Sequence, residues 1–439
     1  MSQLISLKGS IPAGNVGVPS DKSISHRALM LSSLAVGRSH ISDLLESDDT
    51  TATVEALRQM GATLSRIGVN QWQVDGVGLG GLLEPTDKIH LGNSGTSARL
   101  LMGLIASHGI SVTMVGDHSL QKRPMARIIT PLEKIGATFK GHHGDKLPLT
   151  IVGSTTPAPI QYTSPIASAQ LKSAILLAGL NTPGVTTVVE PIPTRDHTER
   201  MLKSMGAKIE TQAMEDGSAV IRLWGQPELN PHTISVPGDI SSAAFPITLA
   251  AMTLGAEITL PNIGVNPLRT GVLDALKAMG AHITLENKRI VANEPVADIN
   301  VKGATLKGLT NLGVEPSRMI DEFPILFVAA AMANGTTRLH GLQELRVKES
   351  DRLAVMAKGL KDNGVDVTLF EDGIEIIGTG GHVNGGGIIN SHLDHRIAMS
   401  FAVLGQAAQN PITINDAEVI NTSFPKFVKT MTAIGCRFA

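Results

Sequence analysis

The chain repeats one pattern six times, and this periodicity limits what it can fold into. A glycine ends an amphipathic run at six positions spaced 70 to 84 residues apart: Gly61, Gly136, Gly206, Gly280, Gly364 and Gly435. Regular self-similarity of this kind is typical of a chain built from copies of one supersecondary unit. The pattern predicts six α/β units of about seventy residues, each with a helix that ends at a left-handed glycine.

A second feature precedes each glycine at a similar distance. A short polar cluster leads into a small, apolar run at residues 20–31, 92–103, 168–179, 238–250, 321–333 and 394–405. Ser, Asp and Asn in these clusters are typical helix N-caps, and runs that are apolar nearly all round indicate buried helices. Because a helix N-terminus attracts anions, each cluster is a candidate anion site.

The repeat is also duplicated at a larger scale. Residues 18–25 read VPSDKSIS, and residues 236–243 read VPGDISSA. Three units precede the second copy and three follow it. We therefore expect two similar three-unit domains, a discontinuous one of residues 1–18 and 237–439 and a continuous one of residues 19–236.

Composition excludes several classes of function. The net charge is -2 and aromatic residues make up 3% of the chain, so neither a broad basic surface nor base-stacking platforms for nucleic acid are expected. Cys436 is the only cysteine, which fits a reducing cytoplasm, and the N-terminus lacks the pattern of a secretory signal. No apolar stretch reaches the roughly 18 residues of a membrane span.

Several clusters place cations where helices are expected to begin. Lys22 and Arg27 lie in the first two turns of a buried helix, where cations are unfavourable unless an anion binds; pairing with Asp48 or Asp49 is the alternative. Residues 92–96 form a loop of possible phosphate donors, with Arg99 one turn later, although the spacing is not that of a nucleotide P-loop.

Other charged residues permit a functional and a structural interpretation. Asp321 is expected to begin a buried helix, where a simple N-cap is the alternative to a catalytic carboxylate. The basic residues of QKRPMAR at 121–127 could equally be solvated. No metal-ligand spacing and no nucleophile motif is found, so we expect neither a metal nor a cofactor. The remaining cations, carboxylates and oriented amides suit anionic substrates, handled by electrostatics and proton transfer.

Taken together, the motifs resemble a known family over essentially the whole chain. SDKSISHR, LGNSGTSAR, KRPM, SAQLKS, VKESDRL and LDHRIAMSF are similar to motifs of the enolpyruvyl transferases, and within them to the branch that uses shikimate 3-phosphate. The resemblance implies an inside-out α/β barrel fold, with two domains of three βαβαββ units and an interdomain cleft. It also implies transfer of the enolpyruvyl group of phosphoenolpyruvate to the 5-hydroxyl of shikimate 3-phosphate. That reaction belongs to the shikimate pathway of aromatic amino acid biosynthesis, and the enzymes that catalyse it are targets of glyphosate.

The resemblance also implies roles for individual residues, in a cytoplasmic monomer. The implied catalytic residues are Asp321, Lys22, Lys348 and Glu349. The implied ligands of shikimate 3-phosphate are Lys22, Ser23, Arg27, Ser168, Ala169, Gln170, Arg195, Asp321 and Lys348. The implied ligands of phosphoenolpyruvate are Lys22, Gly95, Arg123, Gln170, Arg352 and Arg396.

One departure from the family pattern, one open question about glyphosate and two alternatives accompany this interpretation. Thr422 occupies the position of a C-terminal lysine that many relatives carry, so that contact is unassigned. The motifs SAQLKS and KRPM resemble the glyphosate-tolerant class, whereas Gly95 leaves room that favours sensitivity. The alternative enzyme is the sister transferase that acts on UDP-N-acetylglucosamine, and the alternative class is a non-catalytic repeat scaffold.

Overall fold

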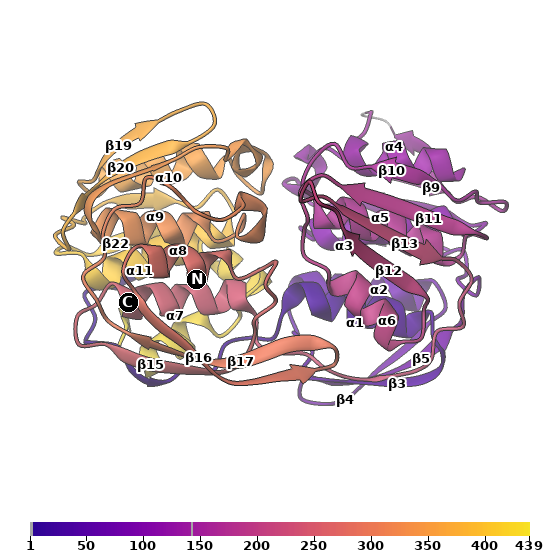
Figure 1. Ribbon diagram of the computed structural model, residues 1–439, viewed down its shortest axis with the longest axis horizontal. Coiled ribbons are helices and arrows are strands. Elements are labelled where there is room, and N and C mark those ends of the chain that lie inside the picture. Colours follow the sequence, from indigo (N-terminus) through magenta and orange to yellow (C-terminus); the bar gives the residue numbers. More distant parts are fainter. Residues whose placement is uncertain (1–2, 142–143) are drawn as a thin grey trace. The chain divides into compact units, whose positions relative to one another are not determined.

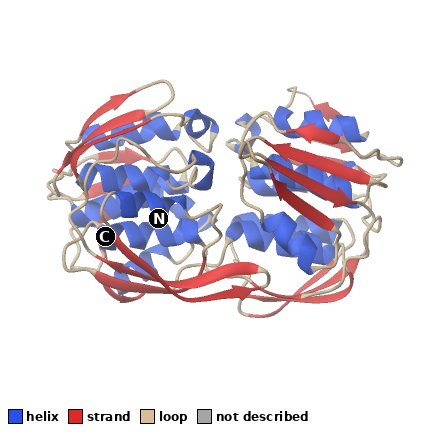
Figure 2. Cartoon of the chain, viewed as in Figure 1, coloured by secondary structure: helices blue, strands red, loops and turns tan. Residues whose placement is uncertain are grey.

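The computed structural model describes residues 3–141 and 144–439 of the 439-residue chain. The chain folds into two compact units, shown in Figures 1 and 2. The unit that contains both chain ends, here called the terminal unit, holds the residues up to Pro19, Pro237–Ile290 and Pro295–Ala439. The other, here called the middle unit, holds Ser20–Val236 and Val291–Glu294.

Three four-stranded sheets form the strands of the middle unit. One has the order β14-β3-β5-β4, with bounds Thr233–Ser235, Val36–Ser42, Gln71–Val77 and Thr63–Gly68. The next has the order β6-β7-β9-β8, with bounds Ile89–His90, Ser111–Val115, Leu149–Val152 and Thr138–Gly141. The third has the order β10-β11-β13-β12, with bounds Gln161–Thr163, Val185–Glu190, Ala219–Trp224 and Ile209–Ala213.

Helices of two kinds alternate along the middle unit. The helices that follow the polar clusters are buried along almost their whole length: α1 (Lys22–Ser33), α3 (Gly95–Ala106) and α5 (Ala169–Leu180). The others bury one face: α2 (Asp48–Gln59), α4 (Ala126–Ile135) and α6 (His197–Ser204). A 3₁₀ turn, η1 (Leu120–Lys122), precedes α4.

The terminal unit repeats this plan with one reduced sheet. Its four-stranded sheets are β16-β17-β15-β2 (His282–Val291, Glu294–Lys302, Glu257–Gly264, Ala13–Asn15) and β21-β22-β1-β23 (Ile388–Asn390, Ile412–Asn415, Gln3–Leu7, Arg437–Phe438). The third sheet, β18-β20-β19 (Asn334–Leu339, Ile374–Thr379, Asp366–Leu369), has three strands. Its fourth position is reduced to a single parallel bridge between Lys307 and Asn334.

The helices of the terminal unit follow the same alternation. The buried ones are α7 (Ile240–Ala251), α9 (Phe323–Met332) and α11 (His395–Ala407). The half-buried ones are α8 (Gly271–Ala278), α10 (Arg352–Asp362) and α12 (Phe427–Ala433). Short 3₁₀ segments are η2 (Pro316–Arg318), η3 (Gln343–Val347) and η4 (Ala417–Thr422). In Figure 2 the strands lie on the outside of each unit and the helices inside.

Two exchanged strands make the units discontinuous in sequence. Strand β2 precedes α1 in the chain, yet it pairs in parallel with β15 of the terminal unit. Strand β14 precedes α7, yet it pairs in parallel with β3 of the middle unit. Each three-repeat unit therefore closes its first sheet with the strand that precedes the first helix of the other unit.

The α/β fold class is confirmed, and so are the local predictions about the repeat. All six predicted glycines have positive φ values, between 83° and 117°, at or just past the ends of the second helices. In the fifth unit, β19 and β20 form an antiparallel hairpin. No helix among the described residues is long and apolar enough to cross a membrane.

One helix boundary was predicted wrongly. Asp321 was expected to begin the fifth buried helix, but α9 starts at Phe323 with Glu322 in the N-cap position. Pro324 favours the first turn of a helix, where its missing N–H costs nothing, and it draws the helix start toward itself. Asp321 therefore lies in the preceding turn, where its carboxylate contacts side chains instead of the N-terminal amides of α9.

Candidate active site

In the middle unit, the first predicted cation is paired across two helices. Lys22 is the first residue of α1, and its Nζ lies 3.0 Å from Asp49 Oδ2 at the start of α2. The side chains of Lys22 and Asp49 are 19% and 10% exposed, so the pair is accessible at one edge. Asp21 caps α1 by accepting a hydrogen bond from the backbone N–H of Ile24. The partner that the sequence suggested as an alternative to an anion is thus present in this structure.

Arg27 is held rigidly by its neighbours. Its Nε donates to Thr198 Oγ1 and its Nη2 to Ser173 Oγ, both at 2.7 Å, and its Nη1 donates to the Ser23 carbonyl at 2.9 Å. Thr198 and Ser173 are themselves 2.8 Å apart. The Arg27 residue is only 2% exposed. These contacts fix the plane of the guanidinium before any ligand arrives.

Gly95 lies beneath two guanidinium groups at the start of α3. A Cβ atom built on Gly95 would lie 2.9 Å from Arg123 Nη1 and 3.3 Å from Arg99 Nη1. Arg123 also donates through Nη2 to Asn93 Oδ1. The absence of a side chain at position 95 therefore lets two cations approach the N-terminus of a buried helix, a favourable arrangement for an anion.

Gln170 joins the beginnings of α5 and α3. Its Oε1 accepts a hydrogen bond from Arg99 Nη1 at 2.8 Å, and its Nε2 donates to Thr96 Oγ1 at 3.1 Å. The two helices pack very closely, because a Cβ on Gly103 of α3 would lie 2.6 Å from the Cα of Ala174. Small residues in these two helices thus bring their polar N-termini together.

The remaining predicted residues of this unit lie at or beside α5. Ser168 is the N-cap of α5, accepting from Leu171 N at 3.3 Å, and Ala169 is the first residue of the helix. Arg195 is half-buried in the loop between β11 and α6. Ser168 and Ala169 therefore directly precede Gln170 at the start of α5, and Arg195 lies in a later loop of the same repeat.

Behind these residues lies a buried charge cluster that the sequence motifs did not indicate. Lys172 Nζ contacts Glu190 Oε2 and Glu199 Oε1, both at 2.8 Å, and all three side chains are at least nine-tenths buried. Burial would lower the pKa of Lys172, but the two carboxylates raise it. Burial raises the pKa of Glu199, against the opposing effect of Lys172. Because Lys172 precedes Ser173 and Glu199 follows Thr198, this cluster supports the pair that holds Arg27.

In the terminal unit, Arg352 gathers three carboxylates. Its Nε donates to Asp394 Oδ2 at 2.8 Å, its Nη2 to Glu349 Oε2 at 2.6 Å and its Nη1 to Asp321 Oδ1 at 3.3 Å. Burial alone would lower the pKa of Arg352, but Asp394, Glu349 and Asp321 together raise it further above its ordinary value. The Arg352 side chain is 1% exposed, so its charge is balanced entirely inside the protein.

The predicted catalytic residues surround this arginine. Lys348 Nζ lies 3.6 Å from Asp321 Oδ1. Arg396, in the first turn of α11, donates through Nη1 to the Asp321 carbonyl at 3.0 Å and to Glu322 Oε1 at 3.3 Å. Asp321, Lys348 and Glu349 have side chains 19% to 26% exposed, in contrast to buried Arg352. The reactive groups proposed from the sequence are therefore the accessible members of this cluster.

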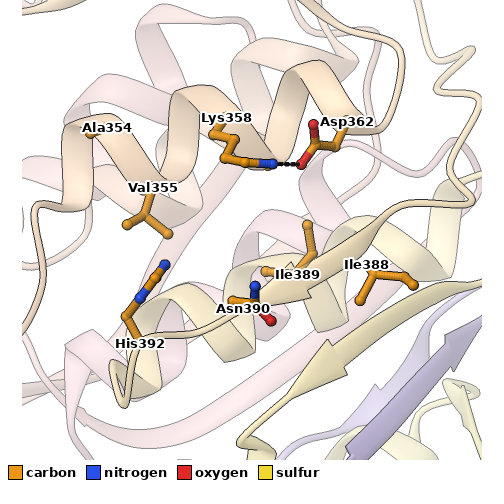
Figure 3. A pocket seen from close by; sticks show the side chains of 9 residues that line it. Ala354, Val355, Lys358, Asp362, Ile388, Ile389, Asn390 and His392 are labelled. Carbon is orange, nitrogen blue, oxygen red and sulfur yellow. Dashed lines mark hydrogen bonds and ion pairs between the residues drawn. The ribbon is translucent and has the colours of Figure 1, made fainter.

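A pocket in the terminal unit lies apart from these residues. It has a volume of about 260 Å³ and lies between α10 and β21, as Figure 3 shows. Lys358 and Asp362 form an ion pair on its α10 side, and Ile388 and Ile389 face it from β21. None of the predicted site residues lines it. The described residues also include no group of three or more His, Cys, Asp or Glu side chains that could hold a metal ion.

Within each unit the structure brings the predicted residues together, and it adds residues that the sequence did not indicate. Ser173 and Thr198 hold Arg27, and Asp394 and Glu322 hold two other arginines. Ser173 ends the SAQLKS motif, and Asp394 begins the sixth polar cluster, whose pattern predicts only a helix cap there. Thr198 and Glu322 carried no sequence signal, because their importance depends on partners more than seventy residues away.

Each of the two three-repeat α/β units places a cation at the start of a buried helix, Lys22 in α1 and Arg396 in α11, an arrangement that favours anionic ligands. The family model for EPSP synthase (3-phosphoshikimate 1-carboxyvinyltransferase) matches residues 8–431. The chain belongs to this family.

Individual relatives match over nearly their full length. The 3-phosphoshikimate 1-carboxyvinyltransferases of Parvibaculum lavamentivorans and Zymomonas mobilis are 53% and 52% identical, covering 97% and 99% of this chain and 94% and 97% of their own. An EPSP synthase structure from Acinetobacter baumannii is 46% identical, with a TM-score of 0.87 and full coverage of both chains. The prediction of a transferase is thus confirmed. These relatives favour neither the UDP-N-acetylglucosamine branch nor a non-catalytic scaffold.

Proposed function

We propose that this protein transfers the enolpyruvyl group of phosphoenolpyruvate to the 5-hydroxyl of shikimate 3-phosphate. The methylene carbon of phosphoenolpyruvate takes up a proton, and the 5-hydroxyl oxygen bonds to the neighbouring carbon as it loses its own proton. The tetrahedral intermediate then loses phosphate and a methyl proton. Membership in the EPSP synthase family over residues 8–431 is the observation that carries this proposal.

Proton transfer is assigned to the accessible carboxylates of the terminal unit. Asp321 is proposed as the base for the 5-hydroxyl, with Lys348 beside it, and Glu349 as the proton donor to the methylene carbon. An acid and a base must lie close together for this chemistry. Asp321 and Glu349 meet this requirement of proximity because both contact Arg352, at 3.3 and 2.6 Å, and both are partly exposed.

Phosphoenolpyruvate binding would change the contacts of Arg352. Arg352 and Arg396 are proposed to bind the substrate carboxylate, yet the three carboxylates of this protein already surround Arg352. Asp394 is fully buried, whereas Glu349 and Asp321 are partly exposed. An incoming carboxylate would therefore replace Glu349 or Asp321, and the displaced group would be released next to the reacting atoms.

Anion binding is assigned to the cations and amides of the middle unit. The proposed phosphoenolpyruvate ligands there are Lys22, Gly95, Arg123 and Gln170. The proposed shikimate 3-phosphate ligands are Lys22, Ser23, Arg27, Ser168, Ala169, Gln170 and Arg195. Preorganised donors of this kind stabilise charge that develops during reaction. The rigid contacts of Arg27 and Gln170 support the assignment.

Phosphate release tests the proposal directly. We expect release with phosphoenolpyruvate and shikimate 3-phosphate together, and none when UDP-N-acetylglucosamine replaces shikimate 3-phosphate. Release only with the nucleotide sugar would overturn the proposal. An inhibition curve for glyphosate against phosphoenolpyruvate would decide between the tolerance suggested by SAQLKS and the sensitivity suggested by Gly95.

We also propose a cytoplasmic monomer. Cys436 is a buried free thiol whose pKa is raised to about 12 by burial, so it resists oxidation and needs no oxidising compartment. Size-exclusion chromatography with light scattering would test the monomer.

A further inference from the structure

His26 begins a chain of buried hydrogen bonds beneath the candidate site of the middle unit. Its Nδ1 lies 2.7 Å from Thr53 Oγ1, which lies 2.7 Å from Ser97 Oγ, which lies 2.6 Å from Ser94 Oγ. All four residues have 0% relative exposure. The chain crosses from α1 through α2 to the start of α3. Hydrogen bonds between buried side chains of different helices restrict how those helices can shift.

The donors and acceptors in this chain can be assigned. His26 Nε2 has no hydrogen-bond partner within the described part of the chain. A buried N–H without an acceptor is costlier than an unpaired lone pair, so the proton of the neutral imidazole lies on Nδ1 and is donated to Thr53. The hydroxyl groups of Thr53 and Ser94 then both donate to Ser97 Oγ. Ser97 is left to donate to the Asp49 carbonyl, 3.3 Å away.

This series of hydrogen bonds therefore ends at Asp49, the residue that pairs with Lys22. The carbonyl of Asp49 receives the Ser97 hydroxyl, while its carboxylate receives the Lys22 ammonium at 3.0 Å. Lys22 and His26 are four residues apart and lie on one face of α1. The contacts form a closed ring that leaves α1 at His26, passes through Thr53, Ser97 and Asp49, and returns to α1 at Lys22.

We infer that His26 is a positioning residue, which fixes Asp49, and with it the Lys22 ammonium, relative to the start of α3. The inference rests on the proposed role of Lys22 in binding both substrates. Ser94 is the N-cap of α3 and precedes Gly95, so the same network ties the proposed phosphate-binding turn to Lys22. His26 itself contacts no substrate, because it is fully buried below the first turn of α1.

Steady-state kinetics of four variants test the inference. His26→Leu removes the donor at nearly constant volume, and Thr53→Val removes the next hydroxyl. Each should raise the KM for both substrates about five- to tenfold, the effect of losing one hydrogen bond. His26→Asn, whose amide N–H can replace Nδ1–H, should stay within about twofold of wild type. Thr51→Val, on the exposed face of α2, is the matched control and should not change either KM.

A double variant separates positioning from a general loss of packing. His26→Leu with Thr53→Val should be no worse than either single variant, because both break the same chain. Additive effects, or unchanged KM values in folded single variants, would overturn the inference. If His26→Leu does not fold, Ser97→Ala provides the same test from the other end. Failure of the proposed function is distinguishable, because wild type itself would then release no phosphate.

Discussion

The Arg352 guanidinium donates to Asp394 Oδ2 at 2.8 Å, and these residues are 42 positions apart in the sequence. Both side chains are essentially inaccessible, at 1% and 0% exposure. Asp394 also caps α11 by accepting from the backbone N–H of Arg396 at 3.0 Å. One carboxylate therefore places the first residues of both α10 and α11, which carry the two arginines proposed to bind phosphoenolpyruvate.

Asp394→Asn should lower the free energy of unfolding and weaken phosphoenolpyruvate binding. Asparagine caps a helix as well as aspartate, so the change removes chiefly the charge that balances Arg352. Losing one partner of a buried ion pair typically costs several kcal/mol, and since two carboxylates remain, we expect about 2 kcal/mol. Urea unfolding measures the loss. Lys358→Ala, which breaks an exposed pair on α10, is the control, and an equally small effect of both variants would contradict the prediction.

Lys172→Met should destabilise the protein more at neutral than at acidic pH. Without the ammonium, Glu190 and Glu199 remain as buried carboxylates, and breaking such a cluster typically costs about 3–5 kcal/mol. Burial already raises the pKa of Glu199 in the folded protein. A folded-state pKa above the unfolded value means that stability is greater at low pH and falls as pH rises through the folded pKa.

Urea unfolding at pH 5 and pH 7 measures the free energy of unfolding of Lys172→Met and of wild type. The difference between the two proteins should be smaller at pH 5 than at pH 7. Lys203→Met, on the exposed side of α6, is the matched control and should behave like wild type at both values. A pH-independent deficit in the Lys172 variant would instead indicate a packing effect.

Gly95→Ala should affect phosphoenolpyruvate selectively. The new methyl group would meet Arg123 Nη1 at 2.9 Å and Arg99 Nη1 at 3.3 Å, so at least one guanidinium must move. We expect the KM for phosphoenolpyruvate to rise about tenfold, the equivalent of roughly 1.4 kcal/mol, with little change for shikimate 3-phosphate. Gly17→Ala, where a methyl group meets no atom within 4 Å, is the control. Equal increases for both substrates would count against the assignment.

The sequence predicted the repeat and the helix starts because both depend on local pattern. Glycine at a helix end and Asp or Ser at a helix start act within a few residues, so Gly136 and Asp394 were identified correctly as caps. The start of α9 was misplaced by two residues because Pro324 competes with Asp321 for the N-terminus. Local signals of this kind leave helix boundaries less certain than helix identity.

The supporting shell of the site could not be predicted, because its contacts depend on packing between repeats. Thr198 matters only because α6 brings it to Arg27, 171 residues earlier in the chain. Lys172 looks like an ordinary helical lysine until the fold buries it between two glutamates. Such long-range pairs leave no periodic or local signature in a single sequence.

His26 should give the protein a measurable acid sensitivity. Burial, with Lys22 and Arg27 adding repulsion and Asp21 opposing it, lowers the pKa of His26 to about 3. The unfolded chain binds this proton below about pH 6.5 and the folded chain only near pH 3, so stability is full above pH 6.5 and falls as pH decreases toward 3. Between pH 7 and pH 5, protonation of His26 in the unfolded chain lowers the free energy of unfolding by about 2 kcal/mol.

His26→Asn cannot take up this proton and should lose less stability over the same interval. The measurement is urea unfolding of both proteins at pH 7 and pH 5. Parallel losses in wild type and His26→Asn would show that other groups dominate the acid response. His282→Asn, at an exposed position in β16, serves as the control for a histidine that folding does not bury.

Asp321→Asn should reduce kcat while leaving substrate binding nearly intact. The amide oxygen can still accept the hydrogen bond from Arg352, which lies 3.3 Å from Asp321 Oδ1, but it cannot take the proton of the 5-hydroxyl. Removing a general base typically costs about 10²–10⁴ in rate. Phosphate release measures kcat, and calorimetry measures binding of shikimate 3-phosphate. Asp351→Asn is the matched control, because Asp351 caps α10 and asparagine can replace it there. Lost binding with normal turnover of the bound complex would assign Asp321 a structural role instead.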